Sequence, residues 1–358
     1  MAKKVLFVTY KLQSYRIPIL DIVGRDSNID LTVLHSSKKS DYSGGHFEEK
    51  IISFKKTGNF TSYNKEFTNL IDEFDVIVCM FYLFNLSFLK LALKRNRKIK
   101  LIFWGIGVRA SYNSTFDAPT IMNNIRYFLA RRSDAMLFYS DYARDKYIKK
   151  GLNEKKLFVM NNTVEVLNSE QNTASKDKII FIGSLYKQKK IFELLESYRE
   201  AVNGFDKKPY ELHIVGGGQE FETIQDWIKA NKLSQYIKLH GAVFEEEKLS
   251  KLFSTAYACI SPGQAGLSVL KSFGYGVAFI THENAITGGE RLNIVNGKNG
   301  LLFSDFLELP EIIMDIFKNP EDFVAMGKNA KLFYNTNRTP QIMANGFIDA
   351  VDYVTTKA

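Results

Sequence analysis

Short apolar runs rich in β-branched and aromatic residues alternate with longer amphipathic stretches along almost the whole chain. A strand followed by a helix, repeated many times, is typical of parallel α/β architecture. Helices with a 3.6-residue period are predicted at 16–24, 84–93 and 141–150, among others. In the first half of the chain, strands are predicted at 5–9, 31–35, 76–79, 101–104, 135–139 and 157–160.

The alternation is interrupted once, at residues 161–177, which are polar and lack periodicity. This composition predicts an interdomain linker. Beyond it, strands are predicted at 179–182, 212–215, 237–239, 258–261, 278–281 and 301–303. We therefore expect two Rossmann-like, doubly wound domains at 1–160 and 178–338. A C-terminal helix over 339–358 is expected to pack back on the first domain.

Two doubly wound sheets in tandem are expected to face each other across a cleft. Open α/β sheets bind ligands beyond the carboxyl ends of their strands. Helix N-termini at that edge favour anions, because their free N–H groups and dipoles point toward the ligand. The pattern thus predicts the position of a ligand, whereas its chemical class must be inferred from the residues of the loops.

Composition narrows the function classes. The formal net charge is +9 and the pI is near 9.2, which favours anionic partners such as phosphorylated ligands or an acidic membrane surface. Cys79 and Cys259 lie in apolar runs, so a reducing, cytoplasmic location is expected. The histidines are scattered, and we expect no metal site. The apolar run at 76–93 is interrupted by polar residues and divides into a strand and a helix, which argues against a membrane span.

The first chemically informative block is Phe181-Ile-Gly-Ser-Leu-Tyr-Lys-Gln-Lys-Lys, which runs from a predicted strand into a predicted helix. Gly183 permits close backbone approach, and Ser184 follows it in the loop. Lys189 stands at the helix start, where a point positive charge suits a diphosphate. The alternative interpretation is a solvated basic helix terminus.

Two further blocks follow the same order of strand, glycines and helix. His213-Ile-Val-Gly-Gly-Gly-Gln places Gly216 and Gly217 after a strand, where they either cradle a phosphate or only close a turn. Ser261-Pro-Gly-Gln-Ala-Gly-Leu-Ser carries a glycine-rich loop into a helix predicted to begin near Leu267. Donor contacts are expected there from Gly263, Gln264, Gly266, Leu267 and Ser268.

These motifs, with Val295-Asn-Gly-Lys-Asn-Gly-Leu-Leu-Phe, stand in one fixed order. That series resembles the C-terminal half of retaining family-four glycosyltransferases, which have the GT-B fold. Ser-Pro-Gly-x-x-Gly-Leu and Ile-Thr-His282 look like a bacterial capsule and O-antigen subgroup. The usual glutamate pair is absent, since Gly263 and Lys271 stand at those positions. Lys271 is expected near the donor, and Glu290 is expected to supply a carboxylate near the sugar.

Candidate catalytic residues are therefore Lys189, Glu290 and His282, the last at the end of a predicted strand. Acceptor contacts are expected from residues that follow strands in the first domain: Tyr15, Arg16, Trp104 and Arg109. For each of these four, packing or helix capping is an equally good interpretation.

A final segment, 81–100, begins with Phe81-Tyr-Leu-Phe and continues with several lysines and arginines and no acid. Aromatic and basic residues together can seat a protein on anionic lipid. A helix with one buried and one solvated basic face is the alternative interpretation.

The resemblance implies a hexosyltransferase that moves a sugar from a nucleoside-diphosphate donor to a glycan or lipid-linked glycan, with retention, in surface polysaccharide synthesis. No obligatory metal or other cofactor is expected, because cationic and N–H groups would stabilise the leaving diphosphate. Two alternatives stay open: a nucleotide-sugar epimerase of the same fold, and a catalytically silent subunit that binds a membrane or a partner enzyme. Nucleic-acid binding would rest on charge alone, since no motif supports it.

Overall fold

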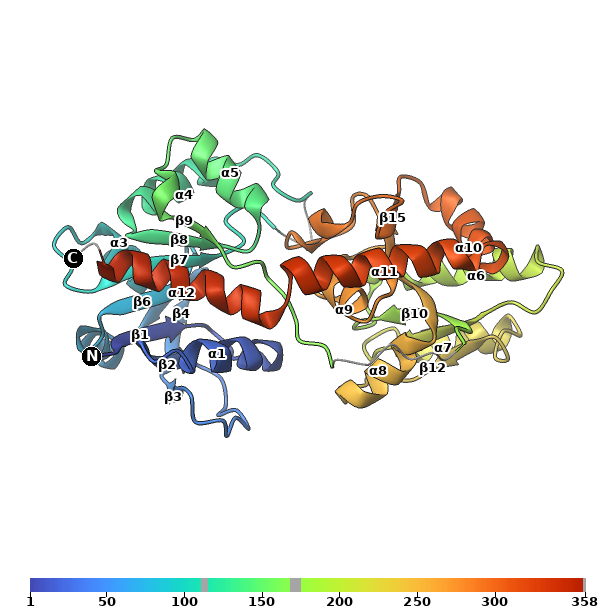
Figure 1. Cartoon of the computed structure of the whole chain (residues 1–358), viewed down its shortest axis with the longest axis horizontal. Helices are drawn as coiled ribbons and strands as arrows, with labels where there is room; N and C mark the ends of the chain where they lie inside the picture. The colour runs from blue at the N-terminus through green and yellow to red at the C-terminus, as the bar shows by residue number, and fades with distance from the viewer. Residues whose placement is uncertain (111–114, 168–174, 357–358) are drawn as a thin grey trace. The chain divides into compact units, whose positions relative to one another are not determined.

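The computed structural model describes residues 1–110, 115–167 and 175–356, which form two compact units (Figure 1). The N-terminal unit comprises residues 1–109, 117–163 and 339–358. The C-terminal unit consists chiefly of residues 164–338.

The N-terminal unit is built on a parallel sheet with the strand order β3-β2-β1-β6-β7-β8-β9. Its central strands are buried on both faces, as parallel strands covered by helices must be, and Val5 of β1 lies between Leu31 of β2 and Val76 of β6. The strand order reverses between β1 and β6, which makes this pair the switch point of the sheet. The strands are β1 (Lys3–Val8), β2 (Ile29–His35), β3 (Glu48–Ile51), β6 (Val76–Met80), β7 (Lys100–Gly105), β8 (Ala135–Phe138) and β9 (Leu157–Val159).

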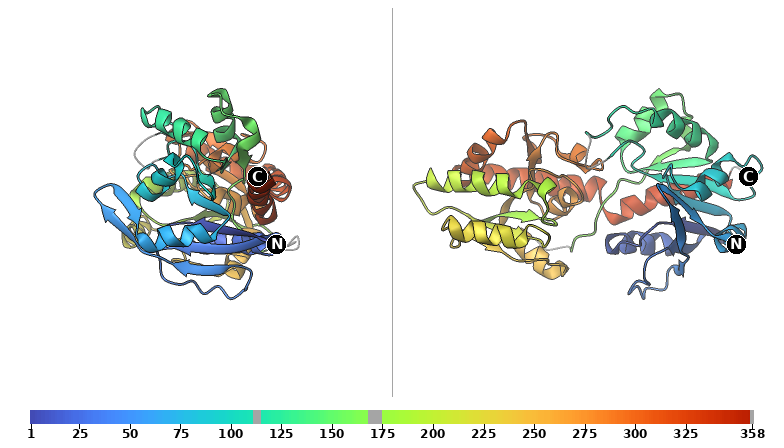
Figure 2. Two further views of the ribbon diagram at one scale, coloured as in Figure 1. Left: turned by 90° about the vertical axis from the view of Figure 1, so that its left-hand side faces the viewer. Right: turned by 180° about the vertical axis from the view of Figure 1, so that it is seen from behind.

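Helices pack against this sheet, and a small antiparallel hairpin of β4 (Phe54–Thr57) and β5 (Phe60–Tyr63) accompanies it. The C-terminal helix α12 (Pro340–Thr356) contacts α1, β8 and β9, and its Phe347 ring lies 5.9 Å from that of Phe7. Figure 2 shows α12 in red beside these strands. The other helices are α1 (Ile17–Gly24), α2 (Lys65–Leu70), α3 (Leu86–Leu93), α4 (Met122–Arg132) and α5 (Asp141–Lys149).

The C-terminal unit holds a second parallel sheet, with the order β12-β11-β10-β13-β14-β15 and its switch point between β10 and β13. Helix α10 packs on α6, and α11 packs on α9 and β13. The strands are β10 (Lys178–Ile182), β11 (Glu211–Val215), β12 (Ile237–Leu239), β13 (Ala256–Ile260), β14 (Ala278–His282) and β15 (Gly300–Phe303). The helices are α6 (Ile191–Asn203), α7 (Phe221–Ala230), α8 (Glu246–Ser254), α9 (Ser268–Gly274), α10 (Leu309–Lys318) and α11 (Pro320–Asn337).

The predicted α/β class, with two doubly wound parallel sheets, is confirmed. The sequence pattern missed β3, whose residues Glu48 to Ile51 include three charged side chains and are exposed or half-buried at the sheet edge. It also missed the β4–β5 hairpin and α4. These elements bury few apolar side chains, so their periodicity in the sequence is weak.

Candidate functional site

The loops that follow β10 and β13 meet at the switch point of the C-terminal sheet. The N–H of Gly263, after β13, donates to the carbonyl of Lys189, after β10, at 3.2 Å. Ligands of open α/β sheets bind at such a point, beyond the carboxyl ends of the strands. Two of the three glycine-containing blocks singled out in the sequence are therefore joined here by their backbones.

The third block, after β11, joins them through Gly183 and Gly216. The N–H of Gly183 donates to Val215 O at 3.0 Å, and that of Leu185 donates to Gly217 O at 2.9 Å. A Cβ on Gly216 would stand 1.9 Å from the carbonyl oxygen of Gly183, and the φ of Gly216 is +159°. Only glycine permits this approach. Gly216 thus holds two loops together, which is a different role from cradling a phosphate.

Lys189 is the most unusual charged residue of this edge. Its side chain is 7% exposed, and its Nζ lies against the α-carbon of Gly183, where an added Cβ would be 2.9 Å away. The neighbouring Tyr186 ring centroid is 5.9 Å from Nζ. In the part of the chain that the structure describes, this ammonium has no hydrogen-bond or ion-pair partner. Burial lowers the pKa of Lys189 from 10.5 to about 8.

An unpaired ammonium on a lysine that is only 7% exposed is an unfavourable arrangement in a free protein. A bound anion would relieve it, because the Coulomb attraction is strong where water is excluded. The backbone directs the side chain inward: Lys187 to Lys189 form a 3₁₀ turn, and Lys190 takes the left-handed conformation with φ 60° before α6 begins. The geometry of this turn therefore builds a site for negative charge.

The loop after β13 is fixed around the same turn. Tyr186 donates its hydroxyl hydrogen to the side-chain oxygen of Gln264, and Ser261 Oγ donates to the Gln264 carbonyl at 2.8 Å. A Cβ on Gly263 would be 2.1 Å from Gln188 O, so this glycine also permits close backbone packing. Tyr186 was missed in the sequence, although it lies within the block that singled out Lys189.

Helix α9 begins at Ser268, one residue after the predicted position near Leu267. Its N-terminal turn has no side-chain cap, and a Cβ on Gly266 would meet nothing within 4 Å, so the backbone there is open. The hydroxyl oxygen of Ser268 is buried and lacks a hydrogen-bond partner among the described residues. These groups remain candidates for donor contact. Ser184, in the loop after β10, is exposed.

Lys271 is engaged within the protein. Its Nζ lies 2.5 Å from Glu246 Oε2 and 3.3 Å from the carbonyl of Glu165, and its side chain is 12% exposed. Glu246 also accepts from the hydroxyl of Tyr275. The carboxylate that balances this lysine comes from the start of α8. The expected contact of Lys271 with a donor has no support in this arrangement, because the ion pair already satisfies the ammonium.

Glu290 is 8% exposed and holds a turn after β14. Its Oε2 accepts from the N–H of Gly288 at 2.9 Å and from Thr287 Oγ1 at 3.4 Å. Thr287 Oγ1 in turn accepts from the N–H of Arg291 at 3.1 Å. These contacts show that Glu290 holds this turn, and its expected position near the sugar stays a prediction.

Both ring nitrogens of His282 are bonded to backbone. Nδ1 accepts from the N–H of Asn284 at 2.9 Å, so Nε2 carries the hydrogen and donates to Ser304 O at 2.8 Å. The ring also stacks on Phe306 at 5.2 Å. A general base needs a free nitrogen lone pair, and this histidine has none in the observed contacts. His282 thus holds the turn after β14, and its expected catalytic role stays a prediction.

In the N-terminal unit, Trp104 is a core residue. It is 1% exposed, and its ring lies 4.9 Å from that of Phe7. The expectation that it contacts an acceptor is corrected, because no face of the indole reaches solvent. Arg16 stacks over Trp104 at 4.4 Å and donates to the Tyr139 hydroxyl at 2.8 Å. Tyr15 lies beside the same guanidinium, at 5.4 Å.

Arg109 follows β7 and is half-buried, and its carbonyl accepts from the N–H of Asp117 at 2.7 Å. The structure thus brings Tyr15 and Arg16 together and keeps Arg109 in the same unit. None of these contacts shows an acceptor, so their role stays a prediction.

The segment 81–100 divides between buried and exposed residues. Phe88 is 2% exposed and belongs to the core, whereas Leu86 and Leu93 are 39% and 49% exposed. Arg97 is used inside the fold, where it donates to carbonyls at the end of α3 and to Asp134. Of the helices described here, none combines the length and apolar character needed to cross a bilayer.

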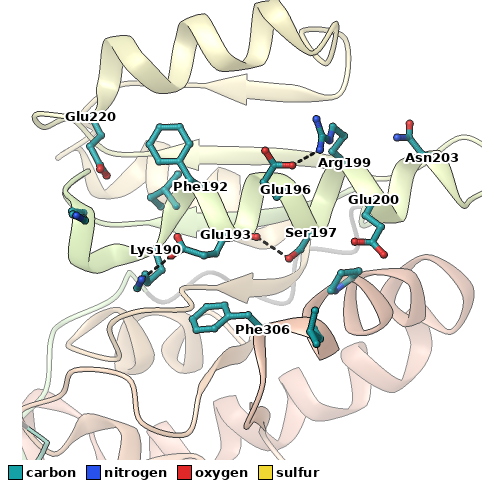
Figure 3. Close-up of a pocket in the computed structure, with 14 residues that line it drawn as sticks. Lys190, Phe192, Glu193, Glu196, Ser197, Arg199, Glu200, Asn203, Glu220 and Phe306 are labelled. Atoms are coloured by element: carbon teal, nitrogen blue, oxygen red, sulfur yellow. Dashed lines mark hydrogen bonds and ion pairs between the residues drawn. The ribbon is translucent and has the colours of Figure 1, made fainter.

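A groove of about 870 Å³ borders this site on the outer side of α6 (Figure 3). Lys190, paired with Glu193 at 2.7 Å, stands at one end beside Phe306. Glu220 lines the same end, and its Oε2 is buried without a hydrogen-bond partner among the residues described. Sequence reasoning missed Glu220, because nothing in the sequence distinguishes it from the many other acidic residues of the chain.

Comparison with known proteins places this site in context. Residues 165–333 match the family model "Glycosyl transferases group 1". The alpha-monoglucosyldiacylglycerol synthase of Acholeplasma laidlawii is 25% identical over 199 residues, which cover 52% of this chain and 47% of the relative. The chain thus spans about half the length of the curated relative that it matches.

Solved structures resemble the chain over nearly its full length. The Anabaena protein HepE, in complex with UDP and glucose, superposes with a TM-score of 0.67 at 13% identity and covers 98% of this chain and 99% of its own. A glycosyltransferase from Rickettsia africae gives a TM-score of 0.73 at 11% identity, with all of both chains covered. The lipopolysaccharide outer core galactosyltransferase WaaB gives 0.66 at 15%, covering 99% and 100%. These likenesses confirm the GT-B fold. The match of residues 165–333 to the glycosyl transferases group 1 model supports the expected enzyme class, a glycosyltransferase.

Proposed function

We propose that this chain, whose residues 165–333 form a glycosyl transferases group 1 domain, moves a sugar from a nucleoside-diphosphate donor to a hydroxyl group of a glycan or lipid-linked glycan. The observation that carries the proposal is Lys189, a residue 7% exposed whose ammonium has no counter-ion among the described residues and lies at the switch point of the C-terminal sheet. The UDP complex of HepE supports a uridine nucleotide as the first ligand to test.

In the proposed reaction, the bond between the anomeric carbon and the diphosphate oxygen breaks as the acceptor oxygen bonds to that carbon. The hydroxyl proton leaves with the diphosphate or with solvent. Negative charge develops on the diphosphate oxygen, and a fixed cation in a dry site stabilises it most. Lys189 supplies that cation, so we propose no obligatory metal ion. Retention of configuration is proposed from the family resemblance.

A lipid-linked acceptor is the finer part of the proposal. The name of the Acholeplasma relative contains a glucosylated diacylglycerol, and WaaB acts in the lipopolysaccharide outer core by its name. We propose by analogy that this chain works at the inner face of a membrane in surface polysaccharide synthesis, as in the capsule and O-antigen subgroup that it resembles. The basic segment 81–100 would face the anionic lipid.

A thermal-shift panel of UDP, GDP, ADP and CDP tests the donor site. We expect one of them to raise the unfolding midpoint, since a ligand that binds only the folded state stabilises it. The matching sugar nucleotides should then be hydrolysed slowly without an acceptor. No midpoint shift with any of the four would refute the proposal. A shift without turnover of any sugar nucleotide would favour a catalytically silent subunit.

A further inference from the structure

Arg16 is a cation without a counter-ion at the carboxyl edge of the N-terminal sheet. Its guanidinium carbon lies 4.4 Å from the centroid of the Trp104 ring, and Nη2 donates to the Tyr139 hydroxyl oxygen at 2.8 Å. Nη1 reaches Thr9 Oγ1 only at 3.5 Å, which is a long hydrogen bond. In the part of the chain that the structure describes, no aspartate or glutamate forms an ion pair with Arg16.

The N–H groups of this guanidinium outnumber the acceptors around it. Each terminal nitrogen carries a pair of N–H donors, and the contacts above use only one member of each pair. Nε is buried and has no hydrogen-bond partner among the described residues. The remaining N–H groups on Nη1 and Nη2 are suited to binding both oxygens of a phosphate or a carboxylate at once. The donor set of Arg16 therefore suits an oxyanion.

Arg16 lies where three parallel strands end. It closes a 3₁₀ turn, Ser14–Arg16, in the connection that follows β1. Trp104 is the last residue but one of β7, and Tyr139 follows β8 directly. Ligands of open α/β sheets bind beyond such carboxyl ends, next to the switch point, which lies here between β1 and β6. Arg16 thus stands where this architecture places a ligand.

The loops around Arg16 do not supply the missing negative charge. Residues 9–16, 81–85 and 139–140, which follow β1, β6 and β8, contain no aspartate or glutamate, and Lys11 is exposed. The acids that come next along the chain are ion-paired within the protein: Asp21 with Arg25, Asp117 with Lys146 and Asp141 with Arg144. An anion that approaches Arg16 therefore meets charge of one sign.

The C-terminal unit offers a parallel. Lys189 is likewise a cation without a counter-ion among the described residues, at the switch point of its own sheet. A cation that lacks a partner at the ligand edge of a sheet is stabilised by a bound anion. Since the donor diphosphate is assigned to Lys189, the anion that suits Arg16 belongs to the other substrate.

We propose that Arg16 binds an anionic group of the acceptor, a phosphate or a uronate carboxylate, through the N–H groups of Nη1 and Nη2. This inference rests on the proposed glycosyl transfer and names the class of acceptor, a glycan that carries a negative charge. Tyr15, 5.4 Å from the same guanidinium, borders the site with its ring. A neutral glycan would leave the cation uncompensated and would bind more weakly.

The fluorescence of Trp104 reports on this site without any turnover. The chain contains two tryptophans, and the indole of Trp227, in the C-terminal unit, donates to Glu196 at 3.2 Å. The variant Trp227→Phe therefore leaves Trp104 as the sole indole. Inorganic phosphate, titrated into this protein at constant ionic strength, should change the emission of Trp104 with saturation, because it neutralises the cation stacked on the ring.

Three further probes and two variants define the anion. Glycerol 2-phosphate and methyl glucuronide separate a phosphate from a carboxylate, and neutral methyl glucoside should give no saturable change. Arg16→Met should weaken the response to phosphate at least about tenfold. Arg16→Lys should weaken it at least about threefold, because an ammonium keeps the charge without the planar fork. Unfolding midpoints of both variants check that the N-terminal unit stays folded.

Arg25→Met is the matched control, since the Arg25 side chain is 62% exposed, lies one helix further along and is already paired with Asp21. It should leave the phosphate response unchanged. Arg16→Met should also keep the thermal response to UDP. Loss of the UDP response in this variant would overturn the proposal, because Arg16 would then hold the donor diphosphate.

Two other results would overturn it. An equal response to methyl glucoside, or a phosphate response that Arg16→Met leaves unchanged, would make Arg16 a packing partner of Trp104 alone. If Arg16→Met does not fold, a folded Arg16→Lys protein with unchanged phosphate affinity would have the same consequence. Failure of the proposed transferase function is distinguishable, since it would abolish the response to nucleotides and leave the phosphate response of Trp104 in place.

Discussion

Replacement of Lys189 by methionine should make the protein more stable and a weaker binder of nucleotide. Methionine keeps the apolar stem that packs against Gly183 and removes only the buried charge. Burial lowers the pKa of Lys189 from 10.5 to about 8. At about 1.4 kcal/mol for each pKa unit, this difference corresponds to at most about 3.5 kcal/mol of native-state destabilisation.

The sign of the pH dependence follows from the direction of the shift. Below pH 8 the lysine is charged in both folded and unfolded chains, so the full penalty applies. Between pH 8 and 10.5 the folded state loses its proton first, and the penalty disappears. The stability advantage of Lys189→Met should therefore be greatest at pH 7 and should shrink toward pH 10. Denaturant unfolding at several pH values measures this difference.

Nucleotide affinity should change in the opposite direction. A hydrogen bond to a charged group contributes about 1.5–3 kcal/mol, so the variant should bind UDP roughly 10- to 100-fold more weakly. In the unmodified chain, Kd should rise about tenfold between pH 7 and pH 9, because only the protonated lysine binds the diphosphate well. The diphosphate itself changes its charge little over this range, since a last pKa of about 6 leaves it about nine-tenths ionised already at pH 7. Titration calorimetry in buffers of different ionisation enthalpy should show proton uptake above pH 8.

Lys187→Met is the matched control, since Lys187 is exposed in the same 3₁₀ turn. It should leave both stability and Kd within measurement error, as surface substitutions usually do within about 0.5 kcal/mol. A destabilised Lys189→Met protein with unchanged UDP affinity would refute the reasoning, because Lys189 would then be a packing residue without an anion.

Substitutions at Gly216, Glu290 and His282 test the frame of the site. Gly216→Ala should destabilise the C-terminal unit by about 2 kcal/mol or more, because its Cβ would meet Gly183 O at 1.9 Å. Gly217→Ala should lower the stability only slightly, because its Cβ would lie 3.5 Å from its nearest neighbour. Equal unfolding midpoints of the two variants would contradict the assigned packing. Glu290→Gln should keep kcat within about fivefold. Glu290→Ala should lower the unfolding midpoint, since it removes hydrogen bonds to the turn that contribute about 1–3 kcal/mol. A complete loss of kcat in the glutamine variant would show direct contact with the sugar. His282→Asn should alter stability while leaving the pH profile of kcat/KM in place, and loss of the acidic limb of that profile would support a general-base role.

Much of the fold follows from the sequence because buried parallel strands are continuous apolar runs. Both sheets show this, and Lys189 could be found because a lysine followed a strand, a glycine and a short loop. The edge strand β3 was not predictable in this way, since Glu48, Glu49 and Lys50 give it no apolar face. Ion pairs between residues far apart in the sequence were equally unpredictable. Nothing near Lys271 in the sequence indicates that Glu246 neutralises it.

The roles of several site residues depend on contacts that spacing cannot show. Gly216 was expected either to cradle a phosphate or only to close a turn, and the close approach that requires it is to the backbone of Gly183. His282 was placed correctly at the end of β14, but its ring nitrogens are bonded to the adjacent turn. The position of Trp104 at a strand end did not show its role either, because a residue there can point into the core as readily as toward a ligand.

The central claim is that Lys189 stabilises a nucleoside diphosphate leaving from a sugar. Its most direct test is the release of nucleoside diphosphate from a panel of sugar nucleotides, measured with the unmodified chain and with Lys189→Met at pH 7. The account predicts release from at least one sugar nucleotide by the unmodified chain and a rate reduced by about tenfold or more in the variant. Equal rates in the two proteins, or no release from any sugar nucleotide together with no binding of the free diphosphates, would contradict it.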